Sequence, residues 1–362
     1  MRRPPIRVLD AGGAPGDIGR AHGAAYADEI RGYTRDRVAL VATGLWSGGP
    51  LEEGDVLDIA ESMLPAHERF DANLYTEMLA MAEAAGITPA QAVVVGGFTD
   101  FVDTVRAVVG GDVPVEVMED DCTAVMVPDG RAGGSGFLAQ TWDMHDTATD
   151  HVVLLRLRPA AGPPALVFTT TGCLGQIGMN AEGVCVGINN LTGLDGRRGV
   201  AWTSVVRGML HASTADEALD TLLDADLAGA HNYLIFDRHG AGYNVEAMPT
   251  VRPVTRLDGE PLVHTNHVID ADAAAVEATK DPTLAASSSA RRAKAIELLE
   301  SGDVDEERLF ELTREPDAIC QMAVEPLHIE SSGAAVMRPR ATEFWACWGR
   351  PAENDYQRIE ML

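Results

Sequence analysis

The fold is decided by two short stretches of sequence, Glu119-Asp120-Asp121-Cys122-Thr123-Ala124-Val125-Met126 and Gln140-Thr141-Trp142-Asp143. The first opens an apolar, β-branched run, Cys122–Val127, which predicts a buried strand. A second strand is predicted over Gly136–Trp142, after a turn built from Pro128-Asp129-Gly130 and Gly133-Gly134. Together the two runs predict a β-hairpin that lays Asp143 back towards Cys122.

A thiol and a carboxylate brought together at the mouth of a sheet favour a functional site. Aligning Asp143 with Cys122 requires desolvation and adds nothing to a hydrophobic core. Both residues also have plainer interpretations. A cysteine after a polar loop can be an ordinary buried strand residue, and on the local sequence alone the two interpretations of Cys122 are about evenly balanced. An aspartate after a strand commonly forms a turn.

Several stretches resemble one enzyme family. Cys-Thr-Ala at 122–124, Ala-Gln-Thr-Trp-Asp at 139–143 and Gly-Ile-Asn-Asn-Leu at 187–191 are similar to stretches of the acyl-coenzyme A:6-aminopenicillanic acid acyltransferase-like peptidases. These peptidases are relatives of the choloylglycine hydrolases within the N-terminal nucleophile hydrolase superfamily. The resemblance continues at 17–23 and 77–87 and covers most of the chain. It implies an α+β fold, the four-layer αββα sandwich of that superfamily.

The resemblance also implies that the chain cuts itself just before a cysteine, here at the Asp121–Cys122 bond. The thiol of that cysteine then acts as the nucleophile and its new α-amino group acts as the base. A thiol suits acyl transfer because its thiolate is a strong nucleophile at modest pKa. The acids at 119–121 would raise the pKa of the thiol if they stayed nearby. Cleavage instead places an amine with a pKa of about 8 beside the thiol.

The same resemblance assigns the remaining site residues. Asp143 would hold the new α-amino group, and Asn189 and Asn232 would form the oxyanion hole. Without the resemblance, an asparagine at a strand end is more often a turn former. The candidate substrate-binding residues are Gln140, Trp142, His264 and Asn266.

Two positions depart from the family pattern. Gln140 stands where choloylglycine hydrolases usually have arginine, which favours the penicillin-acyltransferase-like branch and argues against bile-salt recognition. Gln321 follows Cys320 where the family often has arginine, so the partner of a substrate carboxylate stays unassigned. Arg291, after a run of serines, is an alternative for that role.

The segment His264-Thr265-Asn266-His267 has the HxxH spacing of some metal sites. On a strand that leads into a loop, the two imidazoles do not share a face as they would on a helix. We therefore expect a pocket wall with no metal and no cofactor, and a metal hydrolase remains a third hypothesis. Glu246 and Asp237 flank a predicted hairpin and are expected in surface or turn roles.

The composition excludes some partners. The formal net charge is -27, and lysine occurs only at positions 280 and 294, so neither nucleic acid nor an anionic membrane is an expected partner. No stretch is long and apolar enough to span a bilayer, and no apolar segment follows the two N-terminal arginines, which predicts a cytoplasmic protein. The cysteines at 173, 185, 320 and 347 lie in apolar runs and are expected to be reduced core residues.

The predicted elements change near residue 121, from helices before it to strands after it. Residues 1 to about 110 read as mostly helical, and 110–120 read as an acidic linker. Later strands are predicted at Val152–Leu157, Ala165–Thr170, Val184–Asn189, Tyr233–Phe236, Gly242–Ala247 and 342–348. Later helices are predicted at Ser204–His211, from Thr214 through Leu223, and at Ala290–Leu299 behind a cap at Ser287–Ser289.

The sequence therefore predicts a self-processing amide hydrolase or acyltransferase. We expect residues 1–121 to be a pro-segment retained after cleavage and 122–362 to be the catalytic chain, an α/β heterodimer that forms one structural domain. Higher oligomers stay open. The substrate is expected to be a small acyl-amide or acyl-coenzyme A. The rival hypothesis is an unprocessed binding or scaffold protein, which the Asp121–Cys122 junction and Gln321 keep open.

Overall fold

Two β-sheets form the centre of the molecule in the computed structural model, which describes residues 5–44, 48–109, 122–325 and 328–361. The larger sheet has eight strands, in spatial order β1 (Arg7–Gly13), β4 (Val152–Pro159), β5 (Ala165–Thr170), β6 (Ile177–Asn180), β7 (Val184–Asn190), β8 (His231–Asp237), β9 (Gly242–Ala247) and β10 (Val254–Arg256). Only the β1–β4 pair is parallel, and the other neighbours in this sheet are antiparallel. The predicted strands of this sheet are confirmed, and β5 and β9 have the predicted bounds.

The smaller sheet has six strands, in spatial order β11 (Leu262–His264), β2 (Thr123–Val127), β3 (Phe137–His145), β12 (Ile329–Arg338), β13 (Glu343–Trp348) and β14 (Gln357–Ile359). The predicted hairpin is confirmed, because β2 and β3 are antiparallel neighbours with Thr123 opposite Thr141. A 3₁₀ turn, η1 (Asp129–Arg131), and left-handed backbone at Gly133 and Gly134 connect them. Such backbone favours glycine.

Side chains alternate between the two faces of each strand, and this alternation separates the inside of the sandwich from the outside. On β2 and β3, Ala124, Met126, Leu138 and Trp142 join the core between the sheets. Val125, Val127, Phe137 and Ala139 pack on the opposite face, with residues of two later helices. Cys122 belongs to the inner cluster. The side chain of Cys122 therefore lies on the face of the smaller sheet that packs against the larger sheet.

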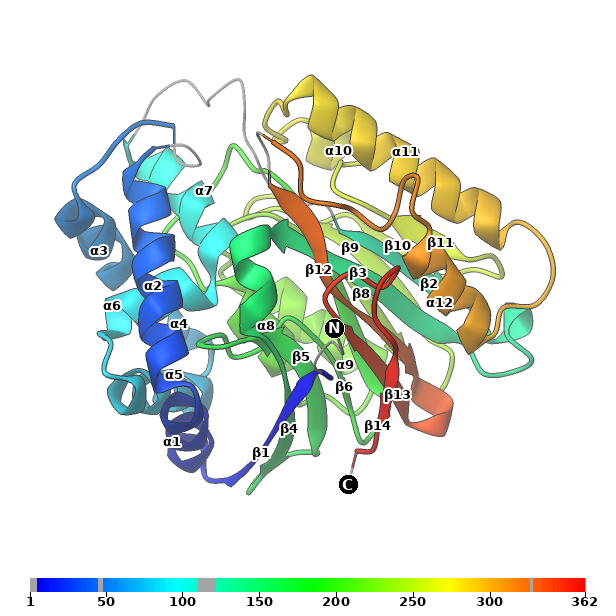
Figure 1. The fold of residues 1–362 in the computed structure, drawn as a ribbon, viewed down its shortest axis with the longest axis horizontal. Coiled ribbons are helices and arrows are strands. Elements are labelled where there is room, and N and C mark those ends of the chain that lie inside the picture. The colour runs from blue at the N-terminus through cyan, green and yellow to red at the C-terminus, as the bar shows by residue number, and fades with distance from the viewer. Residues whose placement is uncertain (1–4, 45–47, 110–121, 326–327, 362) are drawn as a thin grey trace.

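Twelve α-helices are described, and most of them surround the two sheets (Figure 1). They are α1 (Pro15–Ala25), α2 (Ala27–Ala42), α3 (Glu53–Glu61), α4 (Leu64–Phe70), α5 (Ala72–Ala85), α6 (Pro89–Gly96), α7 (Phe98–Val109), α8 (Trp202–Met209), α9 (Ala215–Asp224), α10 (Ala271–Ala274), α11 (Pro282–Leu299) and α12 (Glu306–Arg314). Helix α9 packs on β7, β8 and β9, and α11 and α12 pack on the outer face of the smaller sheet. The sheets contact each other through β2, β3, β7 and β8. This is the predicted four-layer αββα sandwich.

The N-terminal part of the chain is mostly helical, as predicted, and α1 to α7 gather on one side of the sheets (Figure 1). Helices α1 and α2 are separate, because Tyr26 is the C-cap of α1 and the N-cap of α2. Strand β1 joins this part to the larger sheet beside β4. The predicted acidic linker, with Asp121 and the proposed cleavage point, lies outside the described residues.

One helix start was predicted wrongly. Helix α11 begins at Pro282, and its N-cap is Asp281, whose side chain accepts hydrogen bonds from the backbone N–H groups of Thr283 and Leu284. The run Ser287–Ser289 lies inside the helix and does not cap it. An Asp-Pro pair at the N-cap and first helical position satisfies the free N–H groups of a helix better than a later serine run. The earlier start adds Leu284 and Ser288 to the buried face of α11.

Among the described residues, no single helix is both long and apolar enough to cross a bilayer. Helices α5 and α6 meet that test only when they are taken together, and a bend of 105° separates them.

Candidate active site

Cys122 stands immediately before β2 and is 1% exposed. The hairpin register places it beside the end of β3, where its Sγ lies 3.5 Å from the backbone N of Asp143 and 3.8 Å from the backbone O of the same residue. The structure thus brings the predicted nucleophile and Asp143 together, through the backbone of Asp143. Burial does not set Cys122 apart, because all five cysteines are buried and free.

The carboxylate of Asp143 is fully buried and belongs to a short chain of hydroxyl contacts. The hydroxyl of Thr141 donates to Oδ2 of Asp143 at 3.3 Å and accepts from the backbone N–H of Thr123 at 3.2 Å. The hydroxyl therefore links the carboxylate to the residue after Cys122. A negative charge held this way is suited to orient an ammonium group at the start of β2.

Asn189 and Asn232 lie opposite each other on β7 and β8, and Glu246 lies opposite Asn232 on β9. Residues directly opposite across a sheet share one face. On β7 that face looks towards the smaller sheet, because a Cβ added at Gly187 would meet Leu138 and Gln140 of β3. With His264, which lies across from Glu246, these residues form what we call the polar row: Asn189, Asn232, Glu246 and His264.

The two asparagines of the polar row connect to the nucleophile by hydrogen bonds. Nδ2 of Asn189 donates to the backbone O of Cys122 at 3.2 Å. Nδ2 of Asn232 donates to Oδ1 of Asn189 at 3.3 Å. Among the described residues, Oδ1 of Asn232 has no hydrogen-bond partner although it is buried. A side-chain amide carries two N–H groups, so each asparagine can direct a second donor at charge that develops near Sγ.

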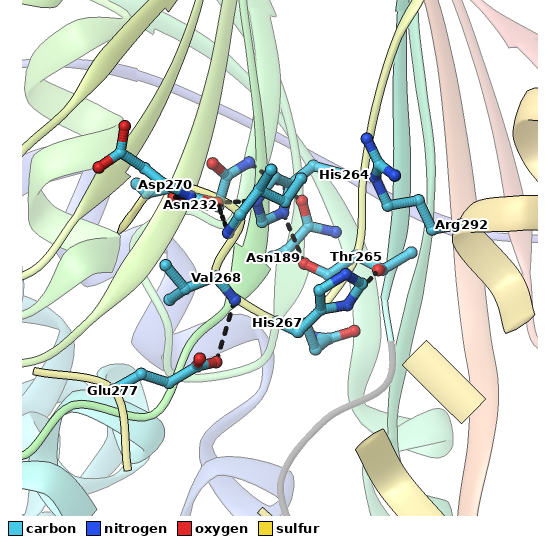
Figure 2. Close-up of polar contacts among 12 residues, drawn as sticks. Asn189, Asn232, His264, Thr265, His267, Val268, Asp270, Glu277 and Arg292 are labelled. Carbon is cyan, nitrogen blue, oxygen red and sulfur yellow. Dashed lines mark hydrogen bonds and ion pairs between the residues drawn. The ribbon is translucent and has the colours of Figure 1, made fainter. Parts of the chain in front are cut away.

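Glu246 and His264 join the two sheets at their edge. Nε2 of His264 lies 2.7 Å from Oε1 of Glu246, and both side chains are buried. Glu246 also accepts the backbone N–H groups of Ile269 and Asp270. Although burial raises the pKa of Glu246, the hydrogen bond from His264 and these backbone donors bring it below its usual value. Figure 2 shows Asn189, Asn232 and His264 beside the segment 265–270.

The surface role predicted for Glu246 is therefore wrong. Asp237, for which the same roles were predicted, does stabilise a turn, because it accepts the backbone N–H groups of His239 and Ala241. Its side chain is buried and does not lie at the surface. His267 does not share the partners of His264: its Nδ1 lies 2.8 Å from Oγ of Ser288. Burial, together with the positive charges around it, lowers the pKa of His267 to about 4.

Gln140 and Trp142, both candidate substrate-binding residues, are buried between the sheets. Oε1 of Gln140 accepts from the backbone N of Ile188 at 2.7 Å, and its Nε2 donates to the backbone O of Ile188 at 3.1 Å. The amide thus clamps β3 to β7. A Cβ at Gly187 would lie 2.7 Å from Oε1 of Gln140, so a side chain at this position would displace the Gln140 amide from its bonds to Ile188. Trp142 packs edge-on against Phe168.

Arg291 of α11 is the site residue that the sequence indicated least. Its Nη1 donates to the backbone O of Cys122 at 2.6 Å and to the hydroxyl of Thr123 at 3.1 Å. Its Nη2 donates to Oδ1 of Asn266 at 3.0 Å, and Nδ2 of Asn266 donates to the backbone O of Asn190. Asn266 therefore links Arg291 to the backbone of β7. A guanidinium here adds positive charge beside the nucleophile.

A signal for Arg291 was present in the sequence once the helix start is correct. The buried residues of α11 are Leu284, Ser288, Arg291, Ala295 and Leu299. Their spacing of three or four residues is that of one helix face. An arginine on such a face, with Arg292 next to it pointing elsewhere, is typical of a buried functional or ion-pairing residue.

With this geometry established, comparison with known proteins identifies the family. Residues 130–353 match the family described as acyl-coenzyme A:6-aminopenicillanic acid acyl-transferase. The chain belongs to this family. A curated relative, the 40 kDa form of acyl-coenzyme A:6-aminopenicillanic-acid-acyltransferase from Emericella nidulans, is 24% identical over 264 residues, which are 71% of this chain and 68% of that protein.

Solved structures with related shapes include two hydrolases. A conjugated bile acid hydrolase from Clostridium perfringens is 11% identical, with a TM-score of 0.49 over 66% of this chain and 92% of that one. Penicillin V acylase from Agrobacterium tumefaciens is 12% identical, with a TM-score of 0.39 over 66% and 86% of the two chains. The family assignment rests on the match over residues 130–353, and the family is described as an acyl-transferase.

Proposed function

We propose that this member of the acyltransferase family cuts its own Asp121–Cys122 bond and then uses the N-terminal Cys122 as a nucleophile on small acyl-amide or acyl-thioester substrates. The observation that carries the proposal is the convergence on one residue. Sγ of Cys122 lies 3.5 Å from the backbone N of Asp143. The backbone carbonyl oxygen of Cys122 accepts hydrogen bonds from both Asn189 and Arg291. Those two donors come from different layers of the sandwich.

The self-cleavage step would proceed through an N-to-S acyl shift. Sγ of Cys122 attacks the carbonyl carbon of residue 121, and the C–N bond of the peptide breaks as a thioester forms. The proton of the thiol passes to the nitrogen that becomes the α-amino group of Cys122. Water then hydrolyses the thioester, which leaves a carboxylate on residue 121 and a free thiol. Fixing the backbone oxygen of Cys122 with two donors limits the motion of the attacking residue.

In turnover, the α-amino group would take the proton of the thiol, and the thiolate would attack the acyl carbonyl of the substrate. The second N–H of Asn189 and of Asn232 would stabilise the oxyanion that forms. Collapse breaks the C–N bond, and the departing amine takes the proton from the α-ammonium. Water or another amine then attacks the thioester carbonyl, the C–S bond breaks, the acyl group passes to the attacking group, and the proton that this group loses returns to Sγ. Asp143 would hold the ammonium in place throughout.

The proposed two chains would remain associated because many contacts join residues 1–109 to the rest. Strand β1 pairs with β4 along its whole length. Glu77 of α5 and Arg207 of α8 form a buried, two-pronged ion pair at 2.8 and 3.1 Å. Oδ2 of Asp100 accepts from the backbone N of Trp202 at 2.7 Å.

The rival function, an unprocessed scaffold of the same fold, has one observation in its favour, namely that Cys122 is as buried as the four structural cysteines. Burial raises the pKa of those four thiols, at Cys173, Cys185, Cys320 and Cys347. A reactive Cys122 would therefore differ from them in its thiolate fraction, which a labelling experiment can measure.

The deciding experiment is intact-mass spectrometry of the purified protein with and without the substitution Cys122→Ala. We expect the natural protein to yield two fragments, 1–121 and 122–362, and the variant to yield one full-length, folded and inactive chain. The cut protein should take up one equivalent of iodoacetamide, at Cys122. A single chain after prolonged incubation, or undiminished turnover by Cys122→Ala, would contradict the proposal and favour the scaffold.

A further inference from the structure

Arg37 of α2 is a buried cation with few partners. Its side chain is 1% exposed and lies between two aromatic rings, 4.6 Å from the ring centre of Tyr33 and 5.0 Å from that of Phe98. Nη2 donates to the hydroxyl of Thr147 at 2.7 Å. Within the described part of the chain, neither Nε nor Nη1 has a hydrogen-bond partner, and Arg37 forms no ion pair with a carboxylate.

A second polar group without a partner lies one helical turn away. Thr34, three residues before Arg37, is also 1% exposed, and among the described residues nothing is hydrogen-bonded to its hydroxyl. Residues three apart on a helix are neighbours on one face. The buried face of α2 therefore carries three donor groups, Nε and Nη1 of Arg37 and the hydroxyl of Thr34, which the described protein leaves unused. Such an arrangement is unfavourable in a folded chain unless something binds there.

The other buried arginines of the described chain have acceptors that are carboxylates or carbonyl and amide oxygens, and Arg106 donates to Oδ1 of Asp103. Arg207, 3% exposed, donates with both Nη groups to Glu77 and with Nη1 also to the backbone O of Leu174. Arg291 donates to Cys122, Thr123 and Asn266. Both guanidinium groups are supplied with acceptors by the chain itself. The guanidinium of Arg37, by contrast, contacts one hydroxyl group, that of Thr147, and the rings of Tyr33 and Phe98.

Arg37 is within reach of a molecule bound at Cys122. Its partner Thr147 belongs to η2 (Asp146–His151), which directly follows β3. Thr147 is four residues after Asp143, and four residues of chain span at most about 14 Å. Asp143 in turn contacts Sγ of Cys122. The guanidinium therefore lies at the same end of β3 as Cys122, within the length that a small substrate can bridge.

Two histidines near Arg37, His145 and His151, have pKa values that its positive charge helps to lower. The hydroxyl of Thr147 also lies 3.0 Å from Nδ1 of His145, which is partly exposed and lies 3.3 Å from Oδ1 of Asp146. Burial lowers the pKa of His145, Asp146 opposes this, and the charge of Arg37 lowers the pKa further. Burial lowers the pKa of His151 too, with Glu29 opposing and Arg37 again contributing. Both imidazoles therefore favour the neutral form beside the guanidinium.

We propose that Arg37, together with Thr34, binds a carboxylate group of the substrate, so that the enzyme acts on amides that carry a free carboxylate. The inference rests on the proposed function for its link to catalysis, and it supplies the carboxylate partner that Gln321 does not provide. A carboxylate is the ligand that fits, because each bidentate edge of the planar guanidinium pairs one of the two free nitrogens with the second N–H of Nη2, and a hydroxyl one turn away adds a further donor. Arg37 touches substrate in this proposal, whereas Tyr33 and Phe98 position it.

The first test measures stability and needs no substrate. If Arg37 is kept for binding, Arg37→Met should leave the melting temperature unchanged or raise it, because methionine fills the space between the rings without burying an unpaired charge. Arg207→Met is the matched control and should lower the melting temperature strongly, since it leaves Glu77 buried without its partner. A loss in Arg37→Met as large as in Arg207→Met would show a structural arginine and overturn the proposal.

The second test measures binding with propionate as the probe and propionamide as the neutral control. Propionate should raise the melting temperature of the natural protein at concentrations where propionamide does not. Its affinity should fall about tenfold or more in Arg37→Met and by less in Thr34→Val, as expected for loss of a charged and of a neutral hydrogen bond. Equal shifts in the natural protein and Arg37→Met, or equal shifts with the two probes, would overturn the proposal.

The two proposals can fail separately. Binding of propionate does not use the thiol, so Cys122→Ala should show the same shift as the natural protein. If that shift appears but the chain is never cut and never turns over an amide, the carboxylate site stands and the proposed catalytic function fails. If turnover is found, an amide with a carboxylate should be hydrolysed with a kcat/KM about tenfold or more above its carboxamide analogue, and Arg37→Met should remove that preference.

Discussion

The space between the two sheets contains two regions that are equally buried and chemically opposite. At one edge lies the polar row of Asn189, Asn232, Glu246 and His264. Further in, Trp142 packs against Phe168, whose ring also occupies the space where a side chain at Gly333 would lie. The first region consists of amide, carboxylate and imidazole side chains, and the second consists of aromatic rings. The difference suggests a division between residues that stabilise the fold and residues that serve function.

Burial alone would favour apolar side chains in both regions. Each apolar side chain removed from water contributes roughly 1.5–3 kcal/mol, whereas a buried polar group costs free energy unless it is fully hydrogen-bonded. The polar row is not fully bonded in the described chain, because Oδ1 of Asn232 lacks a partner. We infer that the aromatic region carries stability and that the polar row carries function. The following predictions test that division.

The largest effect is expected in the aromatic region. Phe168→Ala should lower the free energy of unfolding by about 3–5 kcal/mol, because it leaves a cavity against Trp142 and the backbone at Gly333. Urea denaturation measures this loss. Turnover per folded molecule should stay close to that of the natural protein. A large fall in that turnover would show that the aromatic region also serves catalysis and would break the division.

The next largest effect is expected in the polar row. There turnover should fall while the free energy of unfolding changes little. Asn232→Leu should lower turnover about 100- to 1000-fold if the amide is an oxyanion donor. Its free energy of unfolding should change by only about 1 kcal/mol, because the loss of the bond to Asn189 is offset by removing a buried oxygen without a partner. The measurements are kcat and the urea midpoint. A variant that unfolds easily but turns over normally when folded would make Asn232 structural.

A smaller effect concerns a buried polar group far from the polar row. Burial and the charge of Arg207 lower the pKa of His22 to about 4, and its Nε2 accepts the backbone N–H of Gly172 at 3.1 Å. The unfolded chain, with a pKa near 6.5, binds the proton first, so stability is complete above that pH and falls as the pH drops towards 4. The loss should reach about 3 kcal/mol.

His22→Gln is the control for that measurement. It removes the titrating group and keeps an oxygen that can accept from Gly172. Urea unfolding between pH 7 and 4 should show a shallower decline for His22→Gln than for the natural protein. Parallel curves would mean that other buried histidines, such as His67, account for the acid sensitivity.

Much of the fold could be predicted because its signals are local. The hairpin of β2 and β3 follows from two apolar runs and a glycine-rich turn, and β5 and β9 follow from short runs with clear ends. Strand β12 could not be predicted in the same way. Its sequence, Ile329–Arg338, is rich in serine, glycine and alanine, and it becomes a strand because β3 and β13 pair with both of its edges. Small residues are needed there, since the ring of Phe168 lies against Gly333.

The candidate site shows the same limit. Cys122, Asp143, Asn189 and Asn232 were indicated by family-like motifs, and the structure brings them together; their roles remain predictions. Glu246 was misjudged, and Arg291 was named only as an alternative for a substrate carboxylate, because the partners of both residues are distant in sequence. Glu246 meets His264 only when the edges of two sheets face each other. Arg291 reaches Cys122 across 169 residues of chain, from a helix whose start was misplaced.

The pairing of β1 with β4 has a kinetic consequence if the chain is cut as proposed. Before the cut, β1 and its partner strand belong to one polypeptide, and folding is a first-order process that dilution does not affect. After the cut, the same seven-residue pairing, with the ion pairs of Asp10 to Arg156 and Arg158, joins two separate molecules. Refolding then requires a bimolecular encounter. Unfolding of the mature two-chain enzyme would then be hard to reverse at low concentration. Its lifetime would be set by the rate at which it unfolds.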